Sequence, residues 1–295
     1  MKKRIFLSIL ILLIAASGAL ALTHYFLAMN RPGQPGPFPE RKEGDLRIAT
    51  LNINWLSFNH DPAYTSARLA SIMKEYDIDV VLLQEYRAHW KLNEYEFISI
   101  FSSDYSYISI QDECVCISKY PVVAHKRVKY DDLSDSFSDM EILLSDSQRV
   151  RIFAAHLITT GVNNFRGADQ KAVSSIGSIR TFISNTGIRN NQAVSLSRRA
   201  SEVQSPLVIA GDFNCIPYAT AYRKITRAGL KDCFMVQGHG KGSTYRNLKD
   251  LFRIDFIFYN RHLECTDCRI VDEGISDHKM VVSTFINAYA QSEEQ

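Results

Sequence analysis

The sequence predicts an α/β protein in which mixed β-sheets are layered with helices. About ten short apolar runs have the length and residue types of strands, and about four segments have helical spacing, all within one domain. Several strands follow one another through short turns, whereas others are separated by helices, which favours mixed sheets. The 295 residues are 46% hydrophobic, enough for one substantial core or two small ones.

The strand and helix signals can be placed in order along the chain. A buried strand over 46–53 precedes a helix that begins at Asp61-Pro62, an N-cap followed by a proline at the first helical position. Strands are then expected at 80–83, 105–110, 114–117 and 122–128, of which the last three look like a meander, and at 150–155, 206–210, 254–259, 268–271 and 280–285. Residues 172–185 and 192–204 predict two surface helices, and the acidic segment 131–146 predicts a solvated loop.

The N-terminal 29 residues predict a targeting segment. A positive start, Met1-Lys2-Lys3-Arg4, precedes an apolar run over 5–22 that would span roughly 27 Å as a helix. Ala19-Leu20-Ala21 fits a signal-peptidase site, which would release the protein. Because apolar residues resume over 25–29, we favour a membrane anchor; both alternatives place the domain outside the cytoplasm.

The rest of the chain divides into a linker, one domain and a tail. Residues 30–43 are rich in proline and glycine and predict a semi-extended linker that does not pack. The domain is expected over 44–290, followed by a polar tail over 291–295, and we expect a monomer. Six cysteines suit a compartment outside the cytoplasm and predict buried thiols with one or two disulfides.

The net charge of the domain does not indicate nucleic acid as a partner. The chain carries a net charge of +2, and residues 1–43 contribute +4, which leaves about −2 for the remainder. A local basic segment over 166–205 would either grip a phosphate backbone or be solvated helix surface. Its positive residues are Arg166, Lys171, Arg180, Arg189, Arg198 and Arg199, against Asp169 and Glu202.

Polar residues stand at the ends of several apolar runs. There are too many of them to be explained as ordinary turn-forming residues. They are Asn52, Glu85, His156, Asp212, Asn214, Asp255, Asp277 and His278. Asp255 interrupts an aromatic strand, and a buried carboxylate there needs partners. If the strands share sheet edges, these groups meet in one cleft. Carboxylate and amide oxygens suit Mg²⁺ or Mn²⁺, and histidines supply proton transfer, so the set predicts metal-assisted attack of water on phosphorus.

The ordered motifs resemble the endonuclease/exonuclease/phosphatase superfamily over residues 46–286. The resemblance rests on Leu51-Asn52-Ile53-Asn54, Gln84-Glu85, Ser118-Lys119-Tyr120-Pro121, His156-Leu157, Gly211-Asp212-Phe213-Asn214, Arg253-Ile254-Asp255 and Ser276-Asp277-His278. It implies a four-layer α/β sandwich, with two central mixed β-sheets flanked by helices and the site at one sheet edge.

The resemblance also implies a role for each site residue. Asn52 and Glu85 match the metal positions, Glu85 being the main ligand of Mg²⁺ or Mn²⁺. His278 matches the histidine that contacts the scissile phosphate, and Asp255 or Asp277 would orient a histidine. Asp212 and Asn214 match the pair that positions the nucleophile, and His156 matches a second histidine that contacts phosphate and protonates the leaving group.

The sequence leaves three classes of function open. His156 points toward the deoxyribonuclease-like or sphingomyelinase-like branches of the superfamily, whereas Cys215 departs from the polar residue that many relatives carry. The expected substrate is a phosphate ester, either nucleic acid or a phospholipid headgroup, with the membrane contacted through the N-terminal helix. A phosphodiesterase or nuclease is favoured, a lipid or sugar-phosphate esterase is the alternative, and a non-catalytic binding module is the third.

Overall fold

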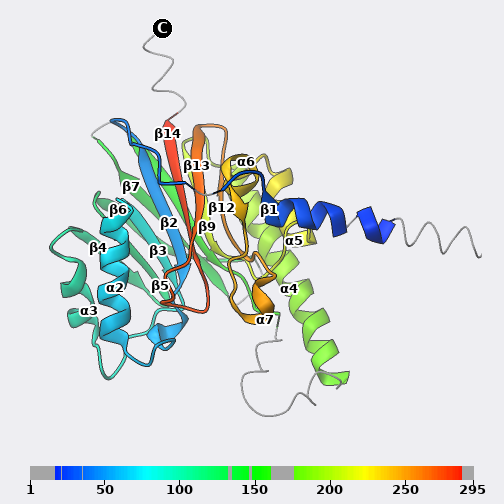
Figure 1. The fold of residues 1–295 in the computed structure, drawn as a ribbon, viewed down its shortest axis with the longest axis horizontal. Coiled ribbons are helices and arrows are strands. Elements are labelled where there is room, and N and C mark those ends of the chain that lie inside the picture. Colours follow the sequence, from blue (N-terminus) through cyan, green and yellow to red (C-terminus); the bar gives the residue numbers. More distant parts are fainter. Residues whose placement is uncertain are drawn as a thin grey trace, which may run out of the picture.

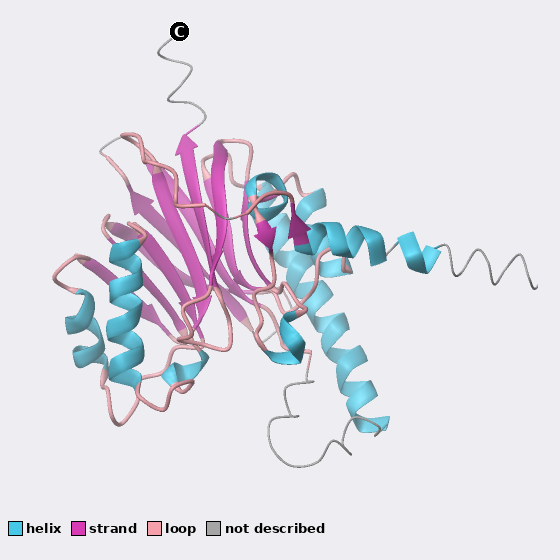
Figure 2. Cartoon of the chain, viewed as in Figure 1, coloured by secondary structure: helices cyan, strands magenta, loops and turns pink. Residues whose placement is uncertain are grey.

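Two six-stranded β-sheets pack face to face, and helices cover both outer faces (Figures 1 and 2). This computed structural model describes residues 17–20, 22–34, 36–131, 135–145, 148–160 and 176–287. The arrangement confirms the four-layer sandwich with two mixed sheets.

The first sheet has the strand order β13-β14-β2-β3-β5-β4. Its strands are β2 (Leu46–Asn52), β3 (Val80–Gln84), β4 (Tyr107–Gln111), β5 (Cys114–Ser118), β13 (Leu263–Val271) and β14 (Met280–Asn287). The neighbours β2 and β3 are parallel, and the other pairs are antiparallel. The last strand of the chain, β14, therefore lies inside the sheet, between β13 and β2.

The second sheet has the order β10-β12-β9-β8-β7-β6. Its strands are β6 (Val122–Lys129), β7 (Ser136–Leu143), β8 (Arg149–His156), β9 (Leu207–Asp212), β10 (Lys231–Asp232) and β12 (Asp255–Tyr259). Here β8 and β9 are the parallel pair. Each sheet thus has one parallel pair, whose two strands end at the same edge.

Alternation along the strands builds three apolar layers. Ile48, Leu82, Ile152 and Val208 point into the layer between the sheets. The opposite face of the first sheet packs against α2 (Pro62–Glu75) and α3 (Glu94–Phe101), and that of the second sheet packs against α4 (Ile176–Ser201) and α5 (Thr220–Arg227). Successive side chains of a strand point to opposite faces of the sheet. A residue two or four positions from a core residue therefore lies on the same face as that residue.

Short elements complete the fold. They are η1 (Asn54–Leu56), α6 (Cys233–Gln237), α7 (Asn247–Asp250) and the two-stranded pair β1 (Asn30–Arg31) with β11 (Gly240–Lys241). The predicted start of α2 is confirmed, because the Asp61 side chain accepts a hydrogen bond from Tyr64 N and Pro62 occupies the first turn. The helix α3, which the sequence analysis did not anticipate, begins with a capping box between Asn93 and Glu96.

Three sequence-based expectations about elements were wrong. The segment 131–146 contains strand β7, whose Asp139 and Glu141 pair with Arg151 and Arg149 of the neighbouring strand. The expected meander is broken, because β4 and β5 form a hairpin in one sheet while β6 joins the other. Finally, α4 is one helix that continues through Gly187, and residues 172–175 lie outside the described part.

The segment 30–43 packs on the domain, contrary to the linker expectation. Asn30 and Arg31 pair with β11, and Arg41 binds Asp77 and Asp79 at 2.7 and 2.6 Å. Phe38 packs its ring against Tyr76. The backbone of Asn30–Arg31 and the side chains of Phe38 and Arg41 provide these contacts, so the prolines and glycines do not leave the segment free of the domain.

The targeting expectation for residues 1–29 falls mostly outside the described residues, which include 17–20 and 22–29 of that segment. Among the described residues, no helix combines the length and apolar character needed to cross a bilayer. All six cysteines are described and are free thiols, so the structure does not contain the one or two disulfides expected from the sequence. Burial raises the pKa of the Cys114 thiol to about 11.

Candidate active site

The polar strand-end residues continue the inner faces of both sheets. Counting in twos from the buried core, Asn52 follows Ile48 on β2, and Asp212 follows Val208 on β9. His156 and Asp255 occupy the same face of β8 and β12. The apolar layer between the sheets therefore ends in a polar layer at one edge, where side chains from the two sheets meet.

The Gly211-Asp212-Phe213-Asn214 turn holds its two polar side chains against each other. Asp212 Oδ1 accepts a hydrogen bond from Asn214 N at 2.8 Å, and Asn214 Nδ2 donates to Leu157 O at 3.0 Å. Gly211 has a φ of 145°, and a Cβ atom there would lie 1.8 Å from Ala155 O. Glycine is thus required for β9 to pass β8 with the Asp212 carboxylate in the cleft.

Asn52 joins the carboxylates of the two sheets. Its amide nitrogen donates to Glu85 Oε1 at 3.0 Å and to Asp212 Oδ2 at 3.2 Å. Its carbonyl oxygen accepts a hydrogen bond from Asn54 N at 3.0 Å, which sets the orientation of the amide. Glu85 follows β3 with a φ of 54°, so the chain turns there out of the strand direction.

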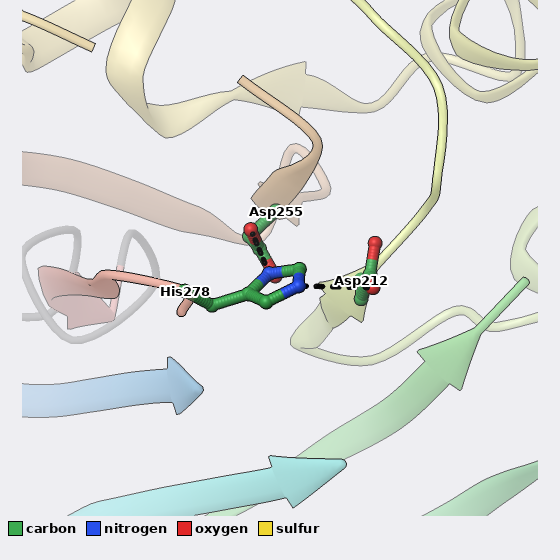
Figure 3. A group of neighbouring side chains, drawn as sticks. All are labelled: Asp212, Asp255 and His278. Carbon is green, nitrogen blue, oxygen red and sulfur yellow. Dashed lines mark hydrogen bonds and ion pairs between the residues drawn. The ribbon is translucent and has the colours of Figure 1, made fainter. Parts of the chain in front are cut away.

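His278 lies between two buried carboxylates (Figure 3). Its Nδ1 is 2.9 Å from Asp255 Oδ2, and its Nε2 is 3.9 Å from Asp212 Oδ2. Burial opposes the charge on the imidazole, but the carboxylates, Asp255 first, raise the pKa of His278 to about 10. Burial and the neighbouring Asp255 raise the pKa of Asp212 to about 6. The site thus pairs an imidazolium with a carboxylate that binds a proton more readily than an exposed aspartate does.

His156 approaches the same carboxylates from the open side. Its Nε2 lies 3.5 Å from Glu85 Oε1 and 3.8 Å from Asp212 Oδ2, and its side chain is 29% exposed. A cavity of about 590 Å³ extends from His156 between the β4–β5 turn and β7, with Arg87 and Arg127 in its wall. An extended substrate can therefore enter beside this histidine.

Asp277 has a structural position that differs from that of the other site residues. Asn247 Nδ2 donates to Asp277 Oδ2 at 3.3 Å, and Arg246 N donates to Asp277 O at 2.9 Å. These bonds tie the residue to the segment around α7. Of the two candidates for orienting His278, the structure gives direct contact to Asp255.

Sequence reasoning missed the residues that hold this histidine–aspartate pair. The ring of Tyr245 lies 4.9 Å from that of His278, and Thr244 Oγ1 accepts a hydrogen bond from Asp255 N at 3.1 Å. Buried Arg253 binds Asp232, the N-cap of α6, at 2.8 and 3.0 Å. Thr244, Tyr245 and Asp232 lie outside the predicted strands, and Arg253, quoted only as part of the motif before Asp255, gave no sign of its partner.

Two alternatives were open for the basic segment before β9, a phosphate-binding patch or solvated helix surface, and the exposed Arg180 and Arg198 on α4 match the second. Arg189 is buried and donates from Nε to Ile158 O at 3.0 Å. Arg198 and Arg199 face Asp131 near the end of α4. Arg166 and Lys171 lie outside the described residues.

The donor set fits a hard divalent cation. Glu85 Oε1 and Asp212 Oδ2 accept hydrogen bonds from one amide nitrogen and therefore lie close together, and among the described residues their ion-pair partners are histidines alone. Asp212, Asp255 and His278 also form a group whose ligand atoms lie within 4.8 Å of one another. Oxygen-rich groups of this kind match Mg²⁺ or Mn²⁺. Asn52 turns its nitrogen to the carboxylates, so ligation by its oxygen would require the amide to rotate.

The pair formed by His278 and Asp255 predicts a pH-dependent contribution to the stability of the metal-free protein. The pKa of His278 rises from 6.5 to about 10 on folding, so the contribution is complete below about pH 6.5 and is lost as the pH rises toward 10. We expect Asp255→Asn to lower the free energy of unfolding by a few kcal/mol near pH 6 and by clearly less above pH 9. Urea unfolding in EDTA measures both values.

The matched control for this experiment is Asp139→Asn. Asp139 pairs with Arg151 at 2.5 Å, and a guanidinium keeps its charge over the same pH range. Its destabilisation should not change with pH. If the effect of Asp255→Asn is equally constant, His278 is not the titrating partner.

Comparisons with known proteins agree with this geometry. A family model described as the Endonuclease/Exonuclease/phosphatase family matches residues 49–278. No curated protein matches the sequence.

Solved structures share the fold at low sequence identity. An endonuclease/exonuclease/phosphatase from Beutenbergia cavernae is 18% identical with a TM-score of 0.61, over 83% of this chain and 72% of that one. A protein of the same description from Bacteroides vulgatus is 18% identical with a TM-score of 0.60, over 82% and 99%. TDP2 from C. elegans is 15% identical with a TM-score of 0.59, over 84% and 77%.

Proposed function

Because the chain belongs to the endonuclease/exonuclease/phosphatase family, whose members are phosphoesterase hydrolases, we propose that it is a Mg²⁺-dependent phosphodiesterase. The observation that carries this proposal is the meeting of Glu85, Asp212, His156 and the His278–Asp255 pair at one edge of two sheets. The family is generally dependent on divalent metals, and the choice of Mg²⁺ over Mn²⁺ belongs to the proposal.

Each residue has a role that follows from its surroundings. A cation held by Glu85 would polarise the phosphate and neutralise its charge. Burial and the neighbouring Asp255 raise the pKa of Asp212, which suits this carboxylate to accept a proton from the attacking water; Asn214, hydrogen-bonded to it at 3.2 Å, helps to place that water. His278 keeps its proton and directs Nε2 into the cleft, where positive charge stabilises the pentacovalent phosphorus. The partly exposed His156 protonates the leaving oxygen.

Metal removal tests the proposal directly. The full-length chain, purified in detergent with Mg²⁺, is expected to hydrolyse bis-p-nitrophenyl phosphate, and EDTA should abolish the turnover because the carboxylates alone repel the anion. Readdition of Mg²⁺ should restore the rate. Absence of any metal-dependent turnover would instead support a non-catalytic binding module.

A phospholipid headgroup is the second candidate substrate. The observation that favours it is a mainly apolar groove beside the segment that contacts Asp277 and His278, lined by residues of 22–30, by Leu251 and by the ion pair of Lys241 with Asp250. Plasmid DNA and sphingomyelin vesicles, assayed in parallel at equal enzyme concentration, distinguish the two substrates. A rate on sphingomyelin at least tenfold above that on DNA would replace nucleic acid by lipid.

A further inference from the structure

The described residues before the domain are fixed to it rather than free. Residues 22–29 are helical, and Tyr25 donates its hydroxyl to Leu251 O at 2.6 Å. Gly242 N donates to Met29 O at 2.7 Å, directly before the pairing of β1 with β11. Ala28 and Met29 are buried. In Figure 1 this helix projects from the domain on the side of α5 and α6.

An apolar groove lies between this helix and the end of α7. Its volume is about 580 Å³, and its lining includes Leu22, Tyr25, Phe26 and Met29 on the helix and Leu251 on the domain. Three of these apolar side chains face water: Leu22 is 71% exposed, Phe26 63% and Leu251 54%. Apolar surface gathered in one place marks a contact with another apolar phase.

The sequence next to the groove indicates that this apolar phase is a lipid bilayer. The apolar run over 5–22 leads into the helix at the wall of the groove, and a run of this length would span roughly 27 Å. Only about 12 Å of helix separates Leu22 from the attachment at Asn30. If the run lies in a bilayer, Phe26 and Leu251 must lie at the depth of its headgroups and upper acyl chains.

We propose that residues 22–29 and Leu251 form a lipid-docking surface that holds the catalytic domain on the bilayer in a fixed orientation. The occupant of the groove is the lipid surface around the N-terminal apolar run. This surface adjoins the active site, because Leu251 ends the segment in which Tyr245 contacts His278 and Asn247 contacts Asp277. Docking would therefore hold the site at one orientation to the membrane rather than letting it turn freely on a tether.

A fluorescent probe at Leu251 tests the proposal without any assay of hydrolysis. The full-length Leu251→Cys variant is labelled with a polarity-sensitive fluorophore and reconstituted in phosphatidylcholine vesicles that contain doxyl-labelled phosphatidylcholine. The native thiols are buried or have raised pKa values, so the new thiol reacts selectively. We expect a blue-shifted emission and at least twofold quenching by the doxyl lipid.

The matched control is Val123→Cys on β6, at the opposite edge of the second sheet. Val123 is 46% exposed, similar to Leu251, and its probe should report water and show no quenching by lipid. Phe26→Cys, on the facing wall of the groove, repeats the measurement if Leu251→Cys does not fold.

Two results would overturn the proposal. Equal quenching at Leu251 and Val123 would mean that the domain has no fixed orientation. A blue shift at Leu251 without lipid quenching would mean that protein, such as a second copy of the chain, covers the groove. Because neither readout depends on turnover, failure of lipid docking is distinguishable from failure of the proposed phosphodiesterase activity.

Discussion

Replacing Glu85 by glutamine is expected to lower kcat by at least about 100-fold, because the cleft loses the carboxylate that would hold the cation. The substitution keeps the shape of the side chain and the hydrogen bond from Asn52 Nδ2 at 3.0 Å, so the protein should remain folded. The concentration of Mg²⁺ required for half-maximal turnover should rise in parallel. Initial rates on bis-p-nitrophenyl phosphate over a Mg²⁺ titration measure both quantities.

The control for this prediction is Glu264→Gln. Glu264 is exposed on β13, and its substitution removes the same charge without touching the cleft. Its kcat should stay within about twofold of the parent. A loss of less than threefold in Glu85→Gln would remove this residue from the metal site and, with it, the mechanism proposed above.

Gly211→Ala is expected to cost more than about 3 kcal/mol of unfolding free energy and to abolish activity. The φ of 145° is rarely open to a side chain, and the new Cβ would meet the carbonyl oxygen and carbon of Ala155 at 1.8 and 2.8 Å. These are backbone atoms of the paired strand β8, which cannot turn aside as a flexible side chain would. Relief of the clash must separate β8 from β9 and displace Asp212.

A substitution at a second glycine, Gly229, measures the cost of backbone strain without a steric clash. Gly229 has a φ of 87°, but a Cβ atom there would have no neighbour within 4 Å. Gly229→Ala should therefore cost only the strain of the left-handed conformation, about 1 kcal/mol. Chemical unfolding of both variants gives the comparison, and equal costs would show that the approach of β8 and β9 is not limiting.

The strands were predictable because burial imposes a local pattern, whereas their assignment to sheets was not. Cys114–Ser118 and Val122–Lys129 are near neighbours in sequence, yet they lie in opposite sheets because the connection crosses the sandwich. The strand β7 was not predicted, because its acidic residues are typical of a solvated loop. The arginines that neutralise Asp139 and Glu141 belong to another strand, and sequence alone does not reveal cross-strand pairing.

The helix α4 shows how packing overrides a local signal. Gly187 indicates a break, since glycine lowers helix stability by about 1 kcal/mol relative to alanine. The burial of Gln192, Ala193 and Leu196 against the second sheet is sufficient to continue the helix. No local rule weighs that tertiary contact.

The meeting of the polar strand-end residues was predictable, because several of them continue the inward-facing side of their strands. The structure places Asn52, Glu85, His156, Asp212, Asn214, Asp255 and His278 in one connected group. The choice between Asp255 and Asp277 was not predictable. Asp277 precedes His278 in the chain, but its carboxylate accepts a hydrogen bond from Asn247, and the hydrogen-bond partner of the His278 ring is Asp255 on another strand.

The position of β14 has a consequence for the order of synthesis. This strand pairs with β2 across more than two hundred residues of chain and brings in His278, the last of the candidate site residues. Such distant pairing forms late in folding. A nascent chain therefore carries its carboxylates and His156 long before it can hydrolyse anything, and hydrolytic activity begins only when the final strand closes the sheet.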